Sequence, residues 1–181
     1  MERFLVRVWK GGLPWAGIAV LALSSALGVA MLVARVLYGG RGHGYLVWNL
    51  FLAWLPLAFA CATWVAAQSS QIQRRFMVLL GCGWLLFLPN APYIVTDLVH
   101  LRPRPPVPLW YDVLLLMVFA WTGVLLGFNS LRLMQRLVAG RWGAWRGWWF
   151  AMMALLLASF GIIWGDSSGG TVGTRWFSRW T

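Results

Sequence analysis

Residues 88–101 read LPNAPYIVTDLVHL, and the interpretation of the whole chain depends on this stretch. It holds two prolines, an asparagine, an aspartate and a histidine, whereas the sequence on both sides of it is strongly apolar. Polar and ionisable groups are energetically unfavourable inside a bilayer, and where they occur they usually have a function. The stretch is therefore the first candidate for a functional site.

The composition indicates an integral membrane protein. Hydrophobic residues make up 61% of the 181 residues and charged residues only 10%, whereas a soluble domain carries about 25% charged residues. A soluble globule cannot bury so much apolar surface, but lipid can cover it. We therefore expect an all-α, polytopic transmembrane helical bundle that forms a single domain over residues 1–164.

Apolar segments separated by short polar links predict about five spans. The third segment is shorter than the ~20 residues that a full span needs. Pro89 and Pro92 follow it, and each ring removes a backbone donor and disfavours helix before it. The third element is therefore predicted to be broken into two pieces. The expected spans cover residues 13–38, 45–67, 76–88 with 93–101, 109–131 and 148–164.

The basic residues predict the orientation. The chain has 15 lysines and arginines against 4 acidic residues, and the basic residues lie in the links between apolar segments. This placement favours the lipid bilayer and anionic headgroups at cytoplasmic arginines as partners, and it argues against nucleic acid. Protein partners stay open. With a cytoplasmic N-terminus, the inner segments hold Arg3, Arg7, Lys10, Arg74, Arg75, Arg132, Arg136, Arg141 and Arg146, and the outer loops hold only Arg35, Arg41, Arg102 and Arg104.

Three stretches resemble one known family. They are YLVWNLFLAWLPLAF at residues 45–59, WLLFLPNAPYIVTDLVHL at residues 84–101 and WYDVLLLMVFAWTGVLLGFNSLRLM at residues 110–134. Together they resemble the bacterial membrane family called domain of unknown function 1361, over about residues 45–161. The resemblance implies a multi-pass protein of the bacterial inner membrane, and it implies no established activity.

After Gly161 the sequence departs from the family pattern and shifts to Gly, Ser and Thr. Family members continue with a string similar to GIYLGRFLRWNSWD and a further, sixth span. Codons that spell IIWGDSSGGTVGT also spell IYLGRLLRWNSWD once a single base is restored. We therefore expect a one-base frameshift near Ile162, with residues 165–181 as a disordered, non-native tail. Sequencing of the gene tests this expectation.

Five polar residues fall at or near the outer face in this topology: Asn49, Asn90, Asp97, His100 and Asp112. Asp97 and His100 lie three residues apart, so a helix would place them on one side. Asp112 opens the next span and can face back towards them. The sequence therefore predicts an outer-face polar pocket of unknown role.

Three interpretations of these residues stay open. In the first, they cap helices and form hydrogen bonds, with Asn90 capping the piece that follows it and Asp112 at a helix N-terminus. In the second, Asp97, His100 and Asp112 form the site of a membrane-embedded enzyme or a metal site, because one histidine and two carboxylates can act as ligands or general bases. In the third, the broken element belongs to a small-solute or lipid transporter. Independently of these interpretations, Asn49 and Asn90 are the candidate ligand-binding residues.

No catalytic motif decides among the three, and nothing in the sequence calls for a cofactor. A single D-x-x-H spacing is a weak signal, and H-E-x-x-H and G-x-S-x-G are absent. Cys61 and Cys82 lie inside apolar segments, which predicts packing and no redox chemistry. Gly123 and Gly127 form a G-x-x-x-G face that predicts a close helix contact. His43 lies in a glycine-rich stretch and is expected to be exposed.

Overall fold

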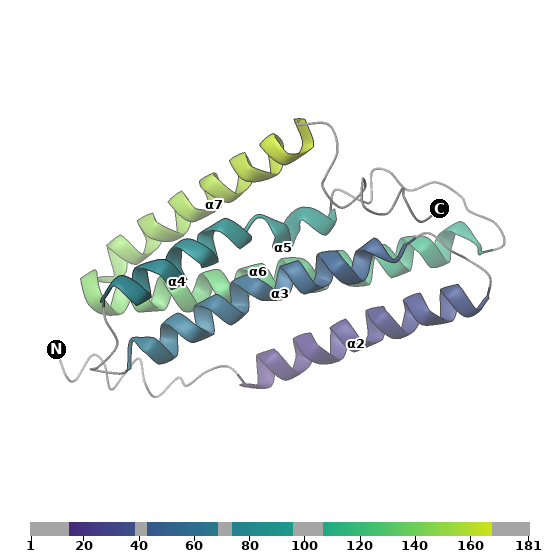
Figure 1. Ribbon diagram of the computed structural model, residues 1–181, viewed down its shortest axis with the longest axis horizontal. Coiled ribbons are helices and arrows are strands. Elements are labelled where there is room, and N and C mark those ends of the chain that lie inside the picture. The colour runs from purple at the N-terminus through teal and green to yellow at the C-terminus, as the bar shows by residue number, and fades with distance from the viewer. Residues whose placement is uncertain (1–14, 39–42, 69–73, 96–106, 168–181) are drawn as a thin grey trace.

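The computed structural model describes residues 15–38, 43–68, 74–95 and 107–167 (Figure 1). These residues form an all-α bundle, which confirms the fold class expected from the sequence. Its helices are α2 (Trp15–Leu37), α3 (Tyr45–Ala66), α4 (Arg74–Phe87), α5 (Asn90–Tyr93), α6 (Leu109–Trp142) and α7 (Ala144–Ser167).

Four helical stretches within the described residues are long and apolar enough to cross a membrane. Large apolar side chains cover their outer surfaces; Leu23 is 71% exposed and Trp121 is 66% exposed. Such a surface suits lipid and not water. The chain is therefore a multi-pass membrane protein. The four stretches are Ala16–Leu37, Tyr45–Ala66, Arg75–Tyr93 and Leu109–Trp142, so α7, the fifth expected span, is not among them.

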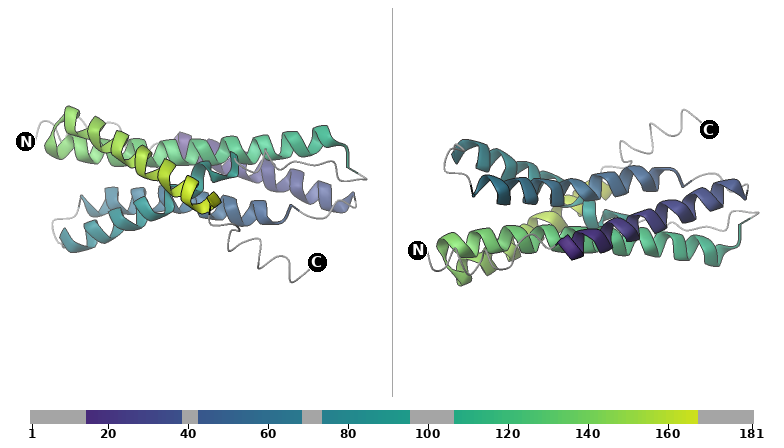
Figure 2. Two further views of the ribbon diagram at one scale, coloured as in Figure 1. Left: turned by 90° about the horizontal axis from the view of Figure 1, so that it is seen from above. Right: turned by 90° about the horizontal axis from the view of Figure 1, so that it is seen from below.

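α6 is the central helix of the bundle. It packs against α2, α3, α5 and α7, while α3 packs also against α4 and α5. Consecutive long helices run in opposite directions (Figure 1), and α7 runs obliquely to the others (Figure 2). The start of α6, the end of α2 and the start of α3 lie at one end, called here the Asp112 end. The α6–α7 turn and the start of α4 lie at the other, called here the Gly143 end.

The buried core is divided along the length of α6. Near the Asp112 end, Leu115, Phe119 and Leu126 pack with side chains of α2, α3 and α5. Nearer the Gly143 end, Leu131 and Met134 pack with side chains of α3, α4 and α7. Both α6 and α3 therefore contribute buried side chains to both halves of the described core.

α6 extends to Trp142, past residue 131, where the sequence suggested that its span ends. Its 34 residues measure about 51 Å at 1.5 Å per residue, well over the ~30 Å of a hydrocarbon core. The supposed basic link after residue 131 is therefore mostly helix. The chain reverses at Gly143, whose φ of 100° lies in the left-handed region that favours glycine.

The third element is broken where its two prolines predict a break. α4 ends at Phe87, and the four-residue helix α5 begins at Asn90. The second piece was expected over residues 93–101, but α5 starts before residue 93. The remainder of that piece, residues 96–101, lies outside the described residues.

Candidate functional site

Asp112, one of the five candidate residues, forms an ion pair with Arg35. Asp112 lies in the first turn of α6, Arg35 lies in the last turn of α2, and both side chains are 0% exposed. Arg35 Nε donates a hydrogen bond to Asp112 Oδ1 at 2.5 Å, and Nη2 donates to Oδ2 at 2.8 Å. This two-pronged geometry matches the planar guanidinium to the planar carboxylate. The end of α2 is therefore fastened to the start of α6.

The position of each charge also suits its own helix. A carboxylate is favourable at the positive N-terminal end of α6, and a guanidinium is favourable at the negative C-terminal end of α2. A buried ion pair is not by itself much more stable than a well-packed apolar pair. Loss of one partner is different, because it leaves the other charge buried and uncompensated. Each of the two buried charges, on Arg35 and Asp112, therefore needs the other to compensate it.

Further polar contacts join α2 to its neighbours. Tyr111 donates from its hydroxyl to the Met31 carbonyl at 2.7 Å, next to the ion pair. The Ser24 and Thr122 hydroxyls lie 2.6 Å apart. In lipid, where apolar contacts give helices little reason to associate, such bonds and close packing hold helices together.

These contacts lie on one face of α2. Ser24, Gly28, Met31 and Arg35 are spaced by four, three and four residues, which places them on one side of a helix. A Cβ added at Gly28 would lie 3.0 Å from the Phe119 ring, so the two helices are close there. We call this face the α2 seam.

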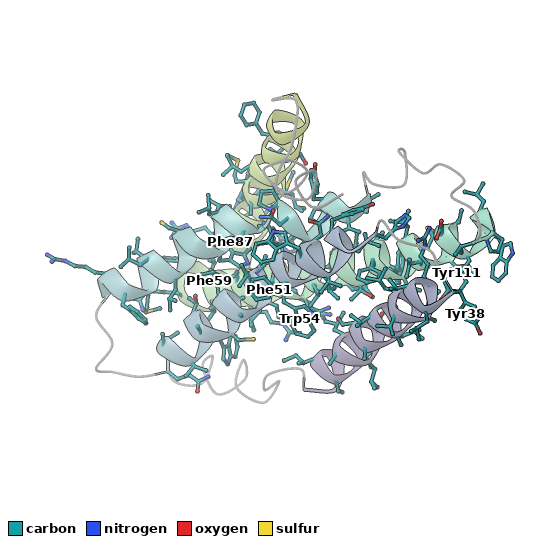
Figure 3. All side chains as sticks on the ribbon, turned by 45° about the vertical axis from the view of Figure 1, so that its right-hand side comes forward. Tyr38, Phe51, Trp54, Phe59, Phe87 and Tyr111 are labelled. Carbon is teal, nitrogen blue, oxygen red and sulfur yellow. The ribbon has the colours of Figure 1, made fainter. Side chains whose placement is uncertain are left out.

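α3 also contributes a hydrogen bond to α2. Trp54 Nε1 donates to Ser25 Oγ at 3.1 Å, and Trp54 lies on the side of α3 nearest α2 (Figure 3). The same figure places Phe59 beside Phe87, and these rings are stacked with centroids 5.8 Å apart. α3 therefore connects α2 on one side with the broken element on the other.

The Asn90 side chain satisfies a backbone carbonyl at the C-terminal end of α4. In an unbroken helix the Phe87 carbonyl would accept a bond from the Ala91 N–H, but that N–H bonds the Leu88 carbonyl at 3.2 Å. Asn90 Nδ2 donates instead to the Phe87 carbonyl, also at 3.2 Å. The prediction that Asn90 caps the following piece was wrong, because Pro89 is the N-cap of α5 and makes no side-chain cap.

The break is enclosed by two neighbouring helices. A Cβ added at Gly123 of α6 would lie 2.4 Å from the Ala91 carbonyl oxygen, and one at Gly127 would lie 2.9 Å from Ala91 Cβ. A Cβ at Gly161 of α7 would lie 3.0 Å from Pro89 Cγ. The close contact predicted from G-x-x-x-G is confirmed, and its partner is the broken element.

The structure does not bring Asn90 and Asp112 together. Ala91 packs at Gly123, and Gly123 lies about 16 Å from Asp112 along the axis of α6 at 1.5 Å per residue. Asn49 is half-buried on α3. The other two candidates, Asp97 and His100, lie outside the described residues, so their place relative to Asp112 stays a prediction.

Arg35 is the residue that the sequence reasoning missed, because it was assigned to an outer loop. The available signal was its position inside the apolar run MLVARVLY, since a charge within a span needs a partner. Asp97 and Asp112 are the only acidic residues in the expected spans, so the choice was narrow. Because Arg35 and Asp112 are 77 residues apart, the sequence did not show which of the two aspartates pairs with Arg35.

Two smaller expectations also need correction. His43 is buried, at 5% exposed, and its ring stacks on Tyr45 with centroids 6.1 Å apart, so it is not an exposed loop residue. Cys61 is half-buried between the two halves of the core, as a packing residue should be, but Cys82 is exposed on the outer surface. Both thiols are free.

The metal-site interpretation gains no support from the residues that the structure places. Among them, no three His, Cys, Asp or Glu side chains lie close enough together to hold a metal ion. Both carboxylate oxygens of Asp112 accept bonds from Arg35. A trio of Asp97, His100 and Asp112 would therefore compete with the ion pair.

The helices and their apolar outer surface define an all-α, multi-pass membrane protein. A family model described as protein of unknown function, DUF1361, matches residues 48–167. The match covers more than half of the chain, so the protein belongs to this family, as the three stretches predicted. α2 and Arg35 lie outside the matched residues, whereas Asp112 lies inside them. Neither a search of curated proteins nor a search of solved structures found a match.

Proposed function

We propose that this chain is a multi-pass protein of the bacterial inner membrane whose helices hold a ligand-binding segment at the outer face. The segment consists of residues 95–106 and carries Asp97 and His100. Its ligand is a polar or ionic molecule, because the Asp97 carboxylate and the His100 imidazole are the groups that can bind it.

The observation that carries the proposal is the burial of the two residues that flank the segment. Ile94 is 0% exposed and packs at Gly123, and Val107 is 9% exposed just before the start of α6. The Arg35–Asp112 ion pair holds that start in place. Binding residues are disproportionately found on segments that a rigid scaffold positions.

The other candidates are already used inside the bundle. Asp112 is engaged by Arg35, and Asn90 bonds the Phe87 carbonyl. This leaves Asp97 and His100, together with Asn49, which is half-buried on α3, as the candidates for contact with a ligand. The same facts weaken the enzyme and metal alternatives, which needed Asp112. The transporter alternative is weakened by the tight packing of α6 and α7 on the break.

We also infer that the N-terminus is cytoplasmic and that arginines of the inner segments meet anionic lipid headgroups. The ion pair supports this orientation, because Asp112 neutralises Arg35 and removes it from the outer charge. The outer loops then keep only Arg41, Arg102 and Arg104 against the inner basic residues.

The test of the site uses a strain that lacks its own copy of the gene. Asp97→Asn and His100→Gln are introduced singly and together, with Thr96→Ser as the matched control in the same segment. Growth under ionic and osmotic stress is compared with the thermal unfolding temperature of the purified chain in detergent. We expect loss of growth at an unchanged unfolding temperature. Unchanged growth in the double variant refutes the site, and a lowered unfolding temperature alone makes both residues structural.

The orientation has a separate test. In a background that carries Cys61→Ala and Cys82→Ala, Pro105→Cys and Ser70→Cys are labelled with a membrane-impermeant maleimide. We expect Pro105→Cys to react in intact spheroplasts and Ser70→Cys to react only after lysis. The reverse pattern contradicts the proposed orientation.

A further inference from the structure

The Gly143 end carries exposed arginine and tryptophan side chains that we call the hairpin tip. Every residue from 141 to 149 is exposed except Gly147. Trp145 is 73% exposed and Trp148 is 63% exposed. Its charged and aromatic members are Arg141, Trp142, Trp145, Arg146, Trp148 and Trp149.

The local backbone explains why these side chains point outwards. α6 ends with the Gly143 N–H bonded to the Ala139 carbonyl at 2.9 Å, and α7 begins one residue later. A Cβ added at Gly147 would lie 2.8 Å from Ala139 Cβ, so the two helices touch just inside the turn. No room for a side chain is left at this contact, and the larger side chains of the tip are exposed.

The length of α6 places the tip at the membrane surface. A helix of about 51 Å that starts at the Asp112 end exceeds the ~30 Å hydrocarbon core and extends into a headgroup layer. Exposed tryptophans are typical of that layer. Trp145 and Trp149 pack edge to face with centroids 6.0 Å apart, and Arg141 lies over the Trp142 ring at 5.9 Å.

The charge of the tip selects the kind of partner. Residues 132–161 contain four arginines and no carboxylate, and Asp112 lies at the far end of α6. A guanidinium presents several N–H donors in a plane and binds phosphate oxygens with two of them. Indole rings beside it suit the glycerol and upper acyl region of a lipid.

We propose that the hairpin tip binds anionic phospholipid, with Arg141 and Arg146 on the phosphate and the tryptophan rings against the glycerol and acyl chains. The side of the membrane on which this happens rests on the orientation proposed above. The lipid binding itself does not depend on that orientation, because the hairpin tip has the same exposed side chains on either side of the membrane.

The experiment measures which lipid the full chain retains. The purified chain in detergent is mixed with equal amounts of phosphatidylglycerol and phosphatidylcholine, repurified, and its bound lipids are counted by mass spectrometry. We expect phosphatidylglycerol to be preferred, and Arg141→Gln/Arg146→Gln to lower the preference by about fivefold per arginine. Arg175→Gln/Arg179→Gln removes the same charge elsewhere in the chain and should leave the preference unchanged.

Three results overturn the proposal: equal retention of both lipids by the wild-type chain, no change in the tip variant, or an equal fall in the control variant. Arg141→Lys/Arg146→Lys keeps the charge and should keep most of the preference. The wild-type ratio decides the question even if the glutamine variant fails to fold. If maleimide labelling reverses the orientation while phosphatidylglycerol is still preferred, only the orientation has failed.

Discussion

Arg35 and Asp112 form a fully buried, two-pronged ion pair between residues that are 77 positions apart in the chain. Asp112 lies within the family match, and Arg35 lies on the helix before it. The pair therefore joins α2 to the family domain. The α2 seam continues this attachment along α6 through hydroxyl contacts and a close approach at Gly28.

Removal of one member of the ion pair should strongly destabilise the protein. Arg35→Met leaves the Asp112 carboxylate buried without a partner, and we expect a loss of about 3–5 kcal/mol in the free energy of unfolding. Arg35→Met/Asp112→Leu removes both charges and should recover most of that loss. Denaturation of the purified chain in detergent checks both. A double variant less stable than either single variant would contradict this account.

Gly123→Ala should destabilise the bundle although alanine is the better helix former. The new methyl group would meet the Ala91 carbonyl oxygen, which is backbone and cannot swing away. Overpacking of this kind costs about 1–3 kcal/mol, against a gain of ~1 kcal/mol in helix propensity. Gly81→Ala is the matched control, because its nearest neighbour, Met134 Cε, is 4.0 Å away. The thermal unfolding temperature should fall for the first variant and hold or rise for the second.

Asn90→Ala should loosen the junction between α4 and α5. It removes the donor to the Phe87 carbonyl and should cost about 1 kcal/mol. Asn129→Ala is the control, because the Leu125 carbonyl that Asn129 Nδ2 bonds is inside a continuous helix and keeps its backbone partner. Amide hydrogen exchange in residues 84–95 should quicken for Asn90→Ala and not for Asn129→Ala. Equal exchange in the two variants would show that the Asn90 bond is dispensable.

Tyr111→Phe should weaken the contact between α2 and α6 without creating a cavity. Only the hydroxyl that bonds the Met31 carbonyl is lost, and we expect a cost of about 0.5–1.5 kcal/mol. Tyr38→Phe removes the same group from a side chain that is 80% exposed, so its unfolding temperature should match the wild type. If both variants melt together, the Tyr111 bond does not hold α2.

Several features of the bundle were predictable because their causes are local in the chain. The membrane class follows from composition. The break in the third element follows from Pro89 and Pro92, since proline chemistry acts on the residues next to it. The small face of Gly123 and Gly127 predicted close packing, and the structure supplied its partner, Ala91. The extent of α6 was missed because arginines after residue 131 were interpreted as a link.

The sequence by itself determined that this is a helical membrane protein, with residues 88–101 as its polar interruption. Only the tertiary structure decided how the polar residues are used. Asp112 pairs with Arg35, and Asn90 donates a hydrogen bond to the Phe87 carbonyl. These two interactions lie at different positions along α6. The physical reason is that composition and proline act on neighbouring residues. A salt bridge or a glycine contact instead depends on which distant segments the bundle brings together, and local sequence does not encode that choice.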